Sequence, residues 1–310
     1  MESSRLRRIE VAMDEDALRA ELAARIAGLS AADGVHPTGL PGVAGIRMSS
    51  PSGTIPAVYH ASLCIVVQGR KQALFDGRTY LYDPLHCLLV STSLPIGGRI
   101  LEASPARPYL CLRIDLDPRI VDEALPQLGA EAPAREADDP QRLMLARTSP
   151  ALLDAALRLL RLCDEPATAP LLAPLVVREI HVRLLAGELG PRLRAVCEID
   201  GPLRRVGGAL TLLRERYAEP LPVEALAEAA HMSPSALYAH FREVTGLSPL
   251  QFQKRLRLQE ARRLMLSDGL DAAAAGHRVG YESPSHFSRE YRRLFGAPPR
   301  REVASAHAAD

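Results

Sequence analysis

The sequence predicts an α+β protein of two domains: an N-terminal antiparallel β-barrel with helices, and an all-α C-terminal domain with two helix-turn-helix units. Three observations lead to this prediction. Short β-branched and aromatic segments, separated by Pro and Gly, fill residues 57–116. Apolar residues at helical spacing dominate after residue 118. Finally, one helical segment is written twice, at 233–249 and at 283–299.

The length and composition fit two domains. A chain of 310 residues with 47% hydrophobic residues can bury two cores. No uninterrupted apolar run approaches the ~20 residues that cross a bilayer, and the charged N-terminus lacks the apolar segment of a signal peptide. We therefore expect a cytoplasmic protein without a membrane partner. The five cysteines are widely spaced and form no CxxC pair, which is typical of reduced thiols.

The N-terminal domain is predicted to span residues 1–195, with the barrel at about 40–116 and helices at about 118–190. Apolar residues at helical spacing predict a leading helix over 14–29. Residues 35–56 are rich in Pro, Gly and Ser, which predicts loops around one short strand. Five or more short strands with regular turns then indicate a small antiparallel barrel or jelly roll.

One hairpin and two helices are predicted in detail. Asp76 and Gly77 separate two short strand patterns, and both residue types tolerate positive φ, so a tight turn is expected there. The segments 151–163 and 171–189 are too apolar for isolated surface helices. They are expected to pack on the barrel or on a second subunit, so that residues 149–189 would carry a dimer contact.

The repeated segment predicts two similar helices. Six of its seventeen positions are identical in the two copies. Ser-Pro opens each copy, with the Ser suited to the N-cap and the Pro to the first helical turn, and a Gly ends each helix. A second short helical pattern precedes each copy, and this combination is typical of helix-turn-helix units. The matched start and end residues are Ser233, Pro234 and Gly246 in the first copy, and Ser283, Pro284 and Gly296 in the second.

The segment between the copies predicts a helix that is buried on two sides. Ser248 and Gln251 form a capping box at its start. One apolar stripe runs along it, and further apolar residues lie roughly opposite. The two sides hold Leu258, Ala261 and Met265, and Phe252 and Leu256, respectively. We therefore expect two helix-turn-helix units joined by one rigid helix.

These motifs resemble a known family. Residues 201–301, with "LAEAAHMSPSALYAHF", "GLSPLQFQKRLRLQEARRLML" and "VGYESPSHFSREYRRLFGAPP", resemble the DNA-binding domain of AraC-type bacterial transcription regulators. Residues 40–120, with "VYHASLCIVVQGRKQALFDGRTYLYDPLHCLLVSTSLP" and "EASPARPYLCLRIDL", resemble the cupin-like N-terminal sensor domain of such regulators. The resemblance implies promoter DNA and RNA polymerase as partners, a small-molecule effector and a homodimer. It places the DNA-binding domain at 200–301.

The predicted DNA-binding residues lie on the outer side of the repeated helices. Two recognition helices held about 34 Å apart can enter successive major-groove faces of one duplex. We expect Arg289 to read a base, because arginine can donate two hydrogen bonds to guanine. Arginines further along each helix are expected to contact phosphates. The full set is Ser233, Ser235, Tyr238, Arg242, Ser283, Ser285, His286, Ser288, Arg289, Arg292 and Arg293.

The sequence departs from the family pattern at two positions. Ala239 stands where family members often carry arginine, so the first unit is expected to read its half-site differently or weakly. Gly276 stands where the family usually has alanine, and a glycine within a helix costs up to about 1 kcal/mol.

The barrel carries few groups for chemistry. Cupin enzymes usually hold a metal with two close histidines and a glutamate, whereas this β segment has only His60 and His86 and no HxH pair. We therefore expect no metal, no cofactor and no catalytic residue. His60, Cys64 and Gln68 alternate onto one strand face and are candidates for binding a small effector, and Cys64 is also a candidate sensor of an electrophile or oxidant.

The sequence therefore predicts an effector-responsive, sequence-specific DNA-binding transcription regulator, an activator that works as a dimer. Two alternatives stay open. A cupin-type metalloenzyme with a helical appendage would bind a metal tightly or turn over a substrate. An architectural DNA binder would need no effector and would bind DNA of any sequence.

Overall fold

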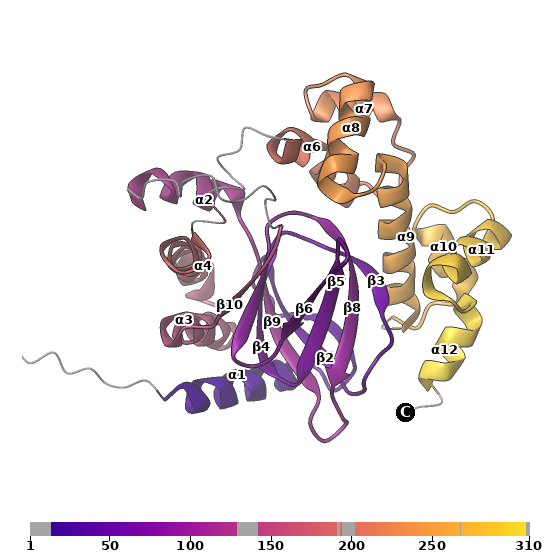
Figure 1. Cartoon of the computed structure of the whole chain (residues 1–310). Helices are drawn as coiled ribbons and strands as arrows, with labels where there is room; N and C mark the ends of the chain where they lie inside the picture. The colour runs from indigo at the N-terminus through magenta and orange to yellow at the C-terminus, as the bar shows by residue number, and fades with distance from the viewer. Residues whose placement is uncertain (1–13, 129–141, 191–192, 194–201, 267, 308–310) are drawn as a thin grey trace, which may run out of the picture.

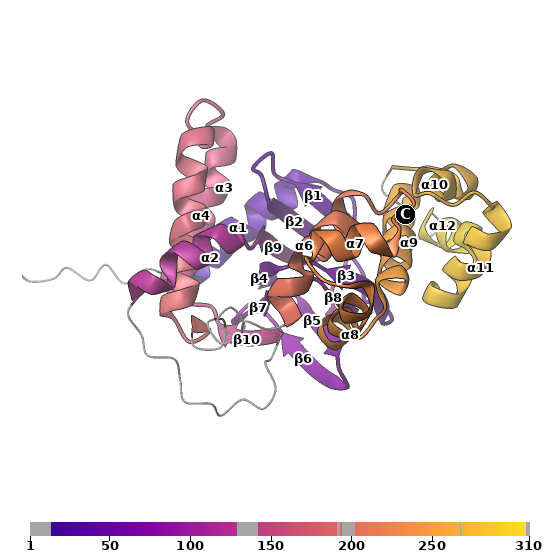
Figure 2. The same cartoon turned by 90° about the horizontal axis from the view of Figure 1, so that it is seen from above.

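A computed structural model describes residues 14–128, 142–190, 193, 202–266 and 268–307. Strands occupy the centre of the molecule, with helices α1–α4 on one side and the helices of the C-terminal domain on the other (Figures 1 and 2). The predicted fold class is confirmed: an antiparallel β domain with helices is followed by an all-α domain. The boundary predicted near 190–202 falls mostly on residues outside those described, so the domain limits stay predictions.

The β domain consists of two antiparallel sheets packed face to face. One sheet has the strand order β1-β2-β9-β4-β7-β10, and the other has the order β3-β8-β5-β6. Inward-facing residues of both sheets form one apolar core, which includes Val66, Leu88 and Ile96. The strands are β1 Gly34–Pro37, β2 Val43–Met48, β3 Ile55–Tyr59, β4 Ser62–Gln68, β5 Arg70–Phe75, β6 Arg78–Tyr82, β7 His86–Val90, β8 Leu94–Glu102, β9 Tyr109–Asp115 and β10 Leu143–Arg147.

The predicted hairpin is confirmed, and two strand predictions are wrong. Asp76 and Gly77 turn between β5 and β6 with φ of 50° and 72°. Residues 35–56 hold most of β1, all of β2 and the start of β3, not one strand. In β2, Gly45 interrupts the strand pattern of the sequence. An added Cβ at Gly45 would lie 2.5 Å from Leu29 Cδ1, so the absence of a side chain allows the first helix to pack closely on this strand. β10 has the composition of a helix but pairs with β7.

Helices α1 to α4 cover the outer face of the six-stranded sheet. Leu22, Leu153 and Ile180 are fully buried in one cluster with side chains of that sheet. Most of this helical surface therefore serves the fold of one chain. The helices are α1 Glu15–Leu29, α2 Pro118–Ala124, α3 Pro150–Arg161 and α4 Ala169–Ala186, with 3₁₀ turns η1 Pro126–Leu128 and η2 Leu162–Asp164.

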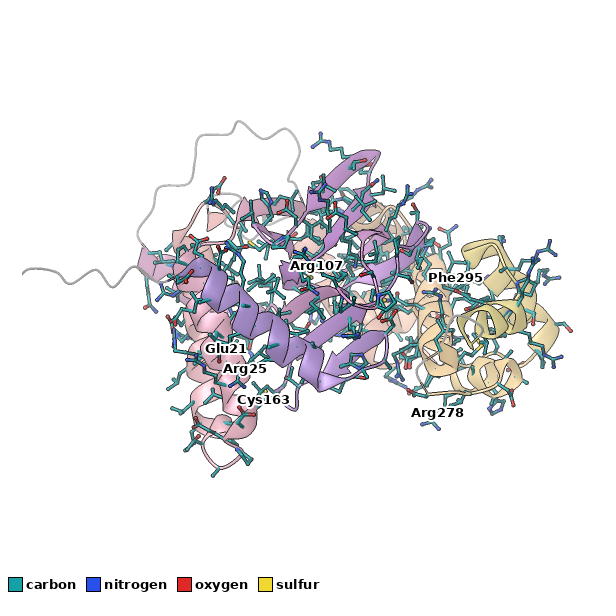
Figure 3. The ribbon with its side chains drawn as sticks, turned by 90° about the horizontal axis from the view of Figure 1, so that it is seen from below. Glu21, Arg25, Arg107, Cys163, Arg278 and Phe295 are labelled. Carbon is teal, nitrogen blue, oxygen red and sulfur yellow. The ribbon has the colours of Figure 1, made fainter. Side chains whose placement is uncertain are left out.

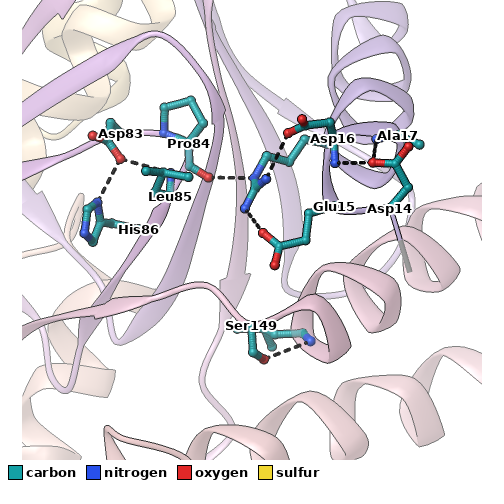
Figure 4. A network of polar contacts seen from close by, with 11 residues as sticks. Asp14, Glu15, Asp16, Ala17, Asp83, Pro84, Leu85, His86 and Ser149 are labelled. Carbon is teal, nitrogen blue, oxygen red and sulfur yellow. Dashed lines mark hydrogen bonds and ion pairs between the residues drawn. The ribbon is translucent and has the colours of Figure 1, made fainter. Parts of the chain in front are cut away.

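Polar contacts fix α1 in place at both ends. Asp14 caps the helix, and Arg19 donates to the Pro84 carbonyl over 3.0 Å while it pairs with Glu15 (Figure 4). Glu21 and Arg25 lie near Cys163, where α1 meets the end of α3 (Figure 3). There Glu21 binds Arg161 and Arg25 binds Asp164, so α1 is tied to its neighbour by charge as well as by packing.

The C-terminal domain is built around α9. Figure 1 shows α6, α7 and α8 at one end of this helix, with α10, α11 and α12 beside its other half. Separate apolar cores form on the two sides, and they are described with the site below. The helices are α6 Pro202–Glu215, α7 Val223–Ala229, α8 Pro234–Thr245, α9 Pro249–Leu266, α10 Ala272–Arg278, α11 Pro284–Phe295 and α12 Pro299–His307.

Candidate nucleic-acid interface and barrel interior

The two repeated segments form equivalent helices with equivalent ends. Ser233 Oγ accepts a hydrogen bond from the Ala236 N–H over 3.3 Å, and Ser283 Oγ accepts one from the His286 N–H over the same distance. Both helices end at a glycine with positive φ, 72° at Gly246 and 85° at Gly296, which costs a glycine little. The predicted caps of α8 and α11 are confirmed.

The helix α9 separates two cores, as predicted. Phe252 and Leu256 face the first unit, where the Phe252 ring meets the edge of Phe241 at 5.4 Å between centroids. Leu258, Ala261 and Met265 face the second unit. The inner sides of α8 and α11 are therefore occupied by packing, which leaves their outer sides for other contacts.

Polar contacts from α9 hold the two units at a fixed relative position. Arg257 donates to the Tyr217 carbonyl over 2.6 Å, in the segment after α6, and to the Gly280 carbonyl over 2.9 Å, in the turn of the second unit. Lys254 pairs with the buried Glu290 over 2.9 Å, and Glu290 also accepts from the Tyr281 hydroxyl. A charged side chain of α9 therefore reaches each unit, and neither unit can turn without breaking these bonds.

The outer sides of α8 and α11 carry most of the predicted DNA-binding residues. Within the described part of the chain, three of their arginines make no ion pair or side-chain hydrogen bond, so their guanidinium groups are available to an anionic partner. These arginines are Arg242, Arg289 and Arg292. The other exposed members of the predicted set are Ser233, Ser235, Tyr238, Ser283, Ser285 and Arg293.

Three predicted residues are more constrained than their neighbours. His286 is half-buried, with Nε2 3.6 Å from Glu290 Oε1. Arg293 reaches the same carboxylate over 3.5 Å, although most of its side chain stays in solvent. Ser288 is half-buried. Arg289 lies between these residues on α11, and its side chain is exposed and makes no ion pair within the described part of the chain.

The two units differ at one exposed position. Ala239 in α8 corresponds to Arg289 in α11 when the repeats are superposed on their Ser-Pro starts, and both residues are exposed. Only the second unit can therefore offer a guanidinium there. The other departure, Gly276 in α10, is explained by packing: an added Cβ would lie 3.0 Å from Cγ of Phe287, a buried residue of the recognition helix.

The interior of the β domain holds a polar cluster around Lys71. Its ammonium lies 5.1 Å from the Tyr59 ring centroid and 5.6 Å from that of Tyr109. The thiols of Cys64 and Cys111 face the same ammonium. The hydrogen bond with Cys111 lowers the pKa of Cys64, and Lys71 and Arg113 lower it further against the opposing effect of burial. The pKa of Cys111 is raised.

Of the three predicted ligand residues, only Cys64 belongs to this cluster. His60 precedes β4 and lies near Ser93 and Arg214, and burial together with the charges of Arg113 and Arg214 lowers its pKa to about 4. A β-bulge follows Val66, and Gln68 donates to the Pro108 carbonyl over 2.7 Å. The alternation argument failed there because a bulge breaks the period of two.

The sequence reasoning missed Lys71 and its aromatic neighbours. One compositional signal was available: the chain has 36 arginines but only two lysines, Lys71 and Lys254. A lysine kept inside a barrel by a chain that otherwise uses arginine is unusual. Within the described residues, no group of three or more His, Cys, Asp or Glu side chains could hold a metal ion, and no described helix is long and apolar enough to span a membrane.

The β domain contacts the C-terminal domain through its edge strand β3. Val58 is buried among residues of α6, α8 and α9. Its N–H donates to Gln259 Oε1 over 2.6 Å, and its carbonyl accepts from Gln259 Nε2 over 3.4 Å. Arg142, just before β10, donates to the Val244 carbonyl near the end of α8 over 2.9 Å. One residue of the first helix-turn-helix unit and one residue of the connecting helix α9 are thus bonded to the β domain.

Comparisons with known proteins agree with this architecture. Residues 39–192 match the family model described as AraC-type transcriptional regulator N-terminus, and residues 226–303 match a helix-turn-helix domain model. The chain is 35% identical over 95 residues to the RCS-specific HTH-type transcriptional activator RclR of Escherichia coli strain K12, which covers 31% of this chain and 34% of RclR. It is 29% identical over 102 residues to the HTH-type transcriptional activator RhaS of Escherichia coli strain SE11, which covers 33% and 37%.

A solved structure shares the fold of nearly the whole chain. ToxT of Vibrio cholerae O395, bound to (E)-4-(8-methylnaphthalen-1-yl)but-3-enoic acid, superposes with a TM-score of 0.57 at 10% identity, over 85% of this chain and 98% of ToxT. At that identity the likeness shows the fold. The matches to RclR and RhaS span about a third of the length of those relatives.

Proposed function

Because the chain belongs to the AraC-type transcriptional regulators, we propose that it binds promoter DNA in a sequence-specific manner and activates transcription. One observation carries this proposal: two helix-turn-helix units with matching caps are joined by a single helix that bonds to both. A protein that reads two successive major-groove faces needs such a fixed pair.

We assign the reading of bases mainly to α11 and the holding of phosphates to both recognition helices. Arg289 is placed early on α11, where recognition helices contact base edges. Arg242, Arg292 and Arg293 lie later on their helices and are assigned to phosphates. Ala239 leaves the first unit with Ser235 and Tyr238 at its exposed start, so we expect weaker sequence preference in that half-site.

The β domain is proposed to bind a small effector and to act on DNA binding through β3. The bound acid of ToxT shows that a protein of this fold can hold a small organic molecule. In this chain, the Val58–Gln259 contact joins the barrel to the helix that holds both recognition units. A ligand that shifts β3 would therefore change the position of α9 and, with it, that of both helix-turn-helix units.

We further propose a cytoplasmic homodimer that contacts RNA polymerase. The first half of α4 exposes Leu171 by 76%, Leu172 by 42% and Leu175 by 63%, whereas apolar residues in its second half, such as Ile180, Leu184 and Leu185, are buried. An apolar face of this kind is typical of an interface between subunits. It is narrower than the dimer contact that the sequence predicted over 149–189.

Selection of duplexes from a random pool by the full-length protein tests the proposed function. We expect enriched sequences with two short blocks about one helical turn, 10–10.5 bp, apart. The block read by α11 should be the more strongly constrained of the two. Recovery of DNA without any enriched sequence would favour the architectural binder, and hydrolytic or metal-dependent turnover of a substrate would favour the enzyme.

A further inference from the structure

The feature that the proposed DNA reading does not use is the cationic group inside the β domain. Lys71 belongs to the inward face of β5, between β8 and β6, where it pairs with Ile100 on one side and Tyr82 on the other. Within the described residues, no carboxylate forms an ion pair with it. Its charge faces only aromatic rings, a phenol and two thiols.

Burial opposes the charge of the Lys71 ammonium, but Tyr59, Cys64 and Cys111 outweigh burial and raise the pKa of Lys71, so the side chain is charged and lacks a carboxylate partner. Taking a charged group out of water costs several kcal/mol when no partner compensates. Contact with the faces of Tyr59 and Tyr109 returns part of this cost. The Tyr59 phenol and the Cys111 thiol are weak acids, so of these neighbours only the Cys64 thiol, whose pKa the hydrogen bond with Cys111 lowers to about 7, provides appreciable negative charge.

The cluster also leaves access to the ammonium. Tyr82 and Tyr109 are each 1% exposed and Cys111 is 1% exposed, but Lys71 and Tyr59 are only half-buried. On β8, the neighbouring strand of the same sheet, position 98 is glycine, and an added Cβ would lie 2.4 Å from the Tyr59 hydroxyl. The missing side chain makes room for Tyr59 to lie across the sheet beside Lys71.

We propose that Lys71 anchors a binding site for a small organic monoanion, a carboxylate with a flat apolar body, inside the β domain. The carboxylate pairs with the Lys71 ammonium, and the half-buried ring of Tyr59 packs on the apolar body. Lysine suits this role because its ammonium is a compact charge that approaches a carboxylate from several directions. This binding site would define the chemical class of the effector for the regulator proposed above. Only the effect of the bound carboxylate on DNA binding rests on that proposed function.

Binding can be measured without DNA. The unmodified full-length protein is titrated with benzoate, phenylacetate and octanoate, and in parallel with the uncharged phenylacetamide, while the melting temperature is recorded. We expect a saturable rise with at least one of the carboxylates. The amide, which matches phenylacetate in shape but lacks its charge, should bind at least tenfold more weakly than phenylacetate.

Two variants assign the effect to Lys71. Lys71→Met keeps the length of the side chain and removes the charge of a half-buried group, so it should fold and should weaken carboxylate binding at least tenfold. Lys71→Arg keeps the charge and should retain part of the binding. Lys254→Met, which changes the other lysine of the chain, is the matched control and should bind as the unaltered protein does.

The two lysines also allow a direct readout. Reductive methylation with ¹³C-formaldehyde labels the lysine amines and the N-terminal amine and preserves their charge, and the Lys71 and Lys254 variants assign the two lysine signals. The Lys71 signal should move on titration with the carboxylate that binds, whereas the Lys254 signal should not. The proposal is overturned if none of the three carboxylates binds, if phenylacetamide binds as well as phenylacetate, or if Lys71→Met binds like the unaltered protein. Loss of DNA recognition with binding intact would count only against the proposed function.

Discussion

Replacing Gln259 by methionine should loosen the contact between the β domain and α9. The substitution keeps the length of the side chain but removes the acceptor for the Val58 N–H and the donor to its carbonyl. Strand β3 is an edge strand, so no neighbouring strand takes over these groups. A buried donor left without a partner costs about 1–3 kcal/mol, and the 3.4 Å second bond adds little.

Water can reach part of this contact, because Gln259 is only half-buried. We therefore expect a cost near the lower part of that range, about 1.4 kcal/mol, which corresponds to a tenfold change in the equilibrium between the docked and the open contact. Hydrogen exchange of the Val58 amide measures this opening directly, and its rate should rise about tenfold in Gln259→Met.

Gln251→Met is the matched control, since it makes the same substitution on the same helix. Among the described residues, the Gln251 side chain bonds only to the Ser248 N–H in the capping box of α9. Exchange at Val58 should therefore stay as in the unaltered protein. Unchanged exchange at Val58 in Gln259→Met, or an equal rise in Gln251→Met, would refute the role assigned to this contact.

Three further predictions follow from the site and the domain contacts. Arg289→Ala should cost about 1–3 kcal/mol of binding free energy on the selected site and little on scrambled DNA, whereas Arg293→Ala should weaken binding to both duplexes alike and reduce the salt slope by about one unit. Filter-binding titrations at several salt concentrations distinguish these patterns. An unchanged ratio of the affinities for selected and scrambled DNA in Arg289→Ala would contradict the assigned role. The pKa of His60 is lowered to about 4 by burial and by Arg113 and Arg214, so the stability that the neutral ring contributes above pH 6.5 should be lost as the pH falls toward 4, roughly 2 kcal/mol of it by pH 5. Urea unfolding at pH 7 and pH 5 should show a smaller loss of unfolding free energy in His60→Gln than in the unaltered protein. An equal loss in the two proteins would argue against this role of His60. Leu175→Glu should shift sedimentation toward the monomer, because it puts a charge on the exposed face of α4, and a dimer that survives the change would mean that the subunits meet elsewhere.

Much of the C-terminal domain could be predicted because its signals are local. The Ser-Pro starts, the final glycines and the capping box act within one turn of a helix, and all of them are present as predicted. The two-sided α9 was also predictable, since the apolar pattern of one helix shows how many sides it buries.

The β domain was predicted less completely because its decisive contacts join distant residues. Strand β10 follows a segment of more than twenty residues after β9, and only its pairing with β7 makes it a strand. The bulge after Val66 removed Gln68 from the predicted face. Lys71 contacts Tyr59 and Tyr109 only once three strands from two sheets are assembled, and no pattern along the sequence predicts this contact.

The central claim is that two recognition helices, held rigidly by α9, read two successive grooves of one duplex. The most direct measurement is the affinity of the protein for its selected site before and after 5 bp are inserted between the two blocks, which turns the second block to the opposite side of the duplex. Because Arg257 and Lys254 fix the units, neither unit can follow this rotation. We predict a loss of affinity of at least about thirtyfold, or about 2 kcal/mol. Equal affinity for the two duplexes would contradict the claim.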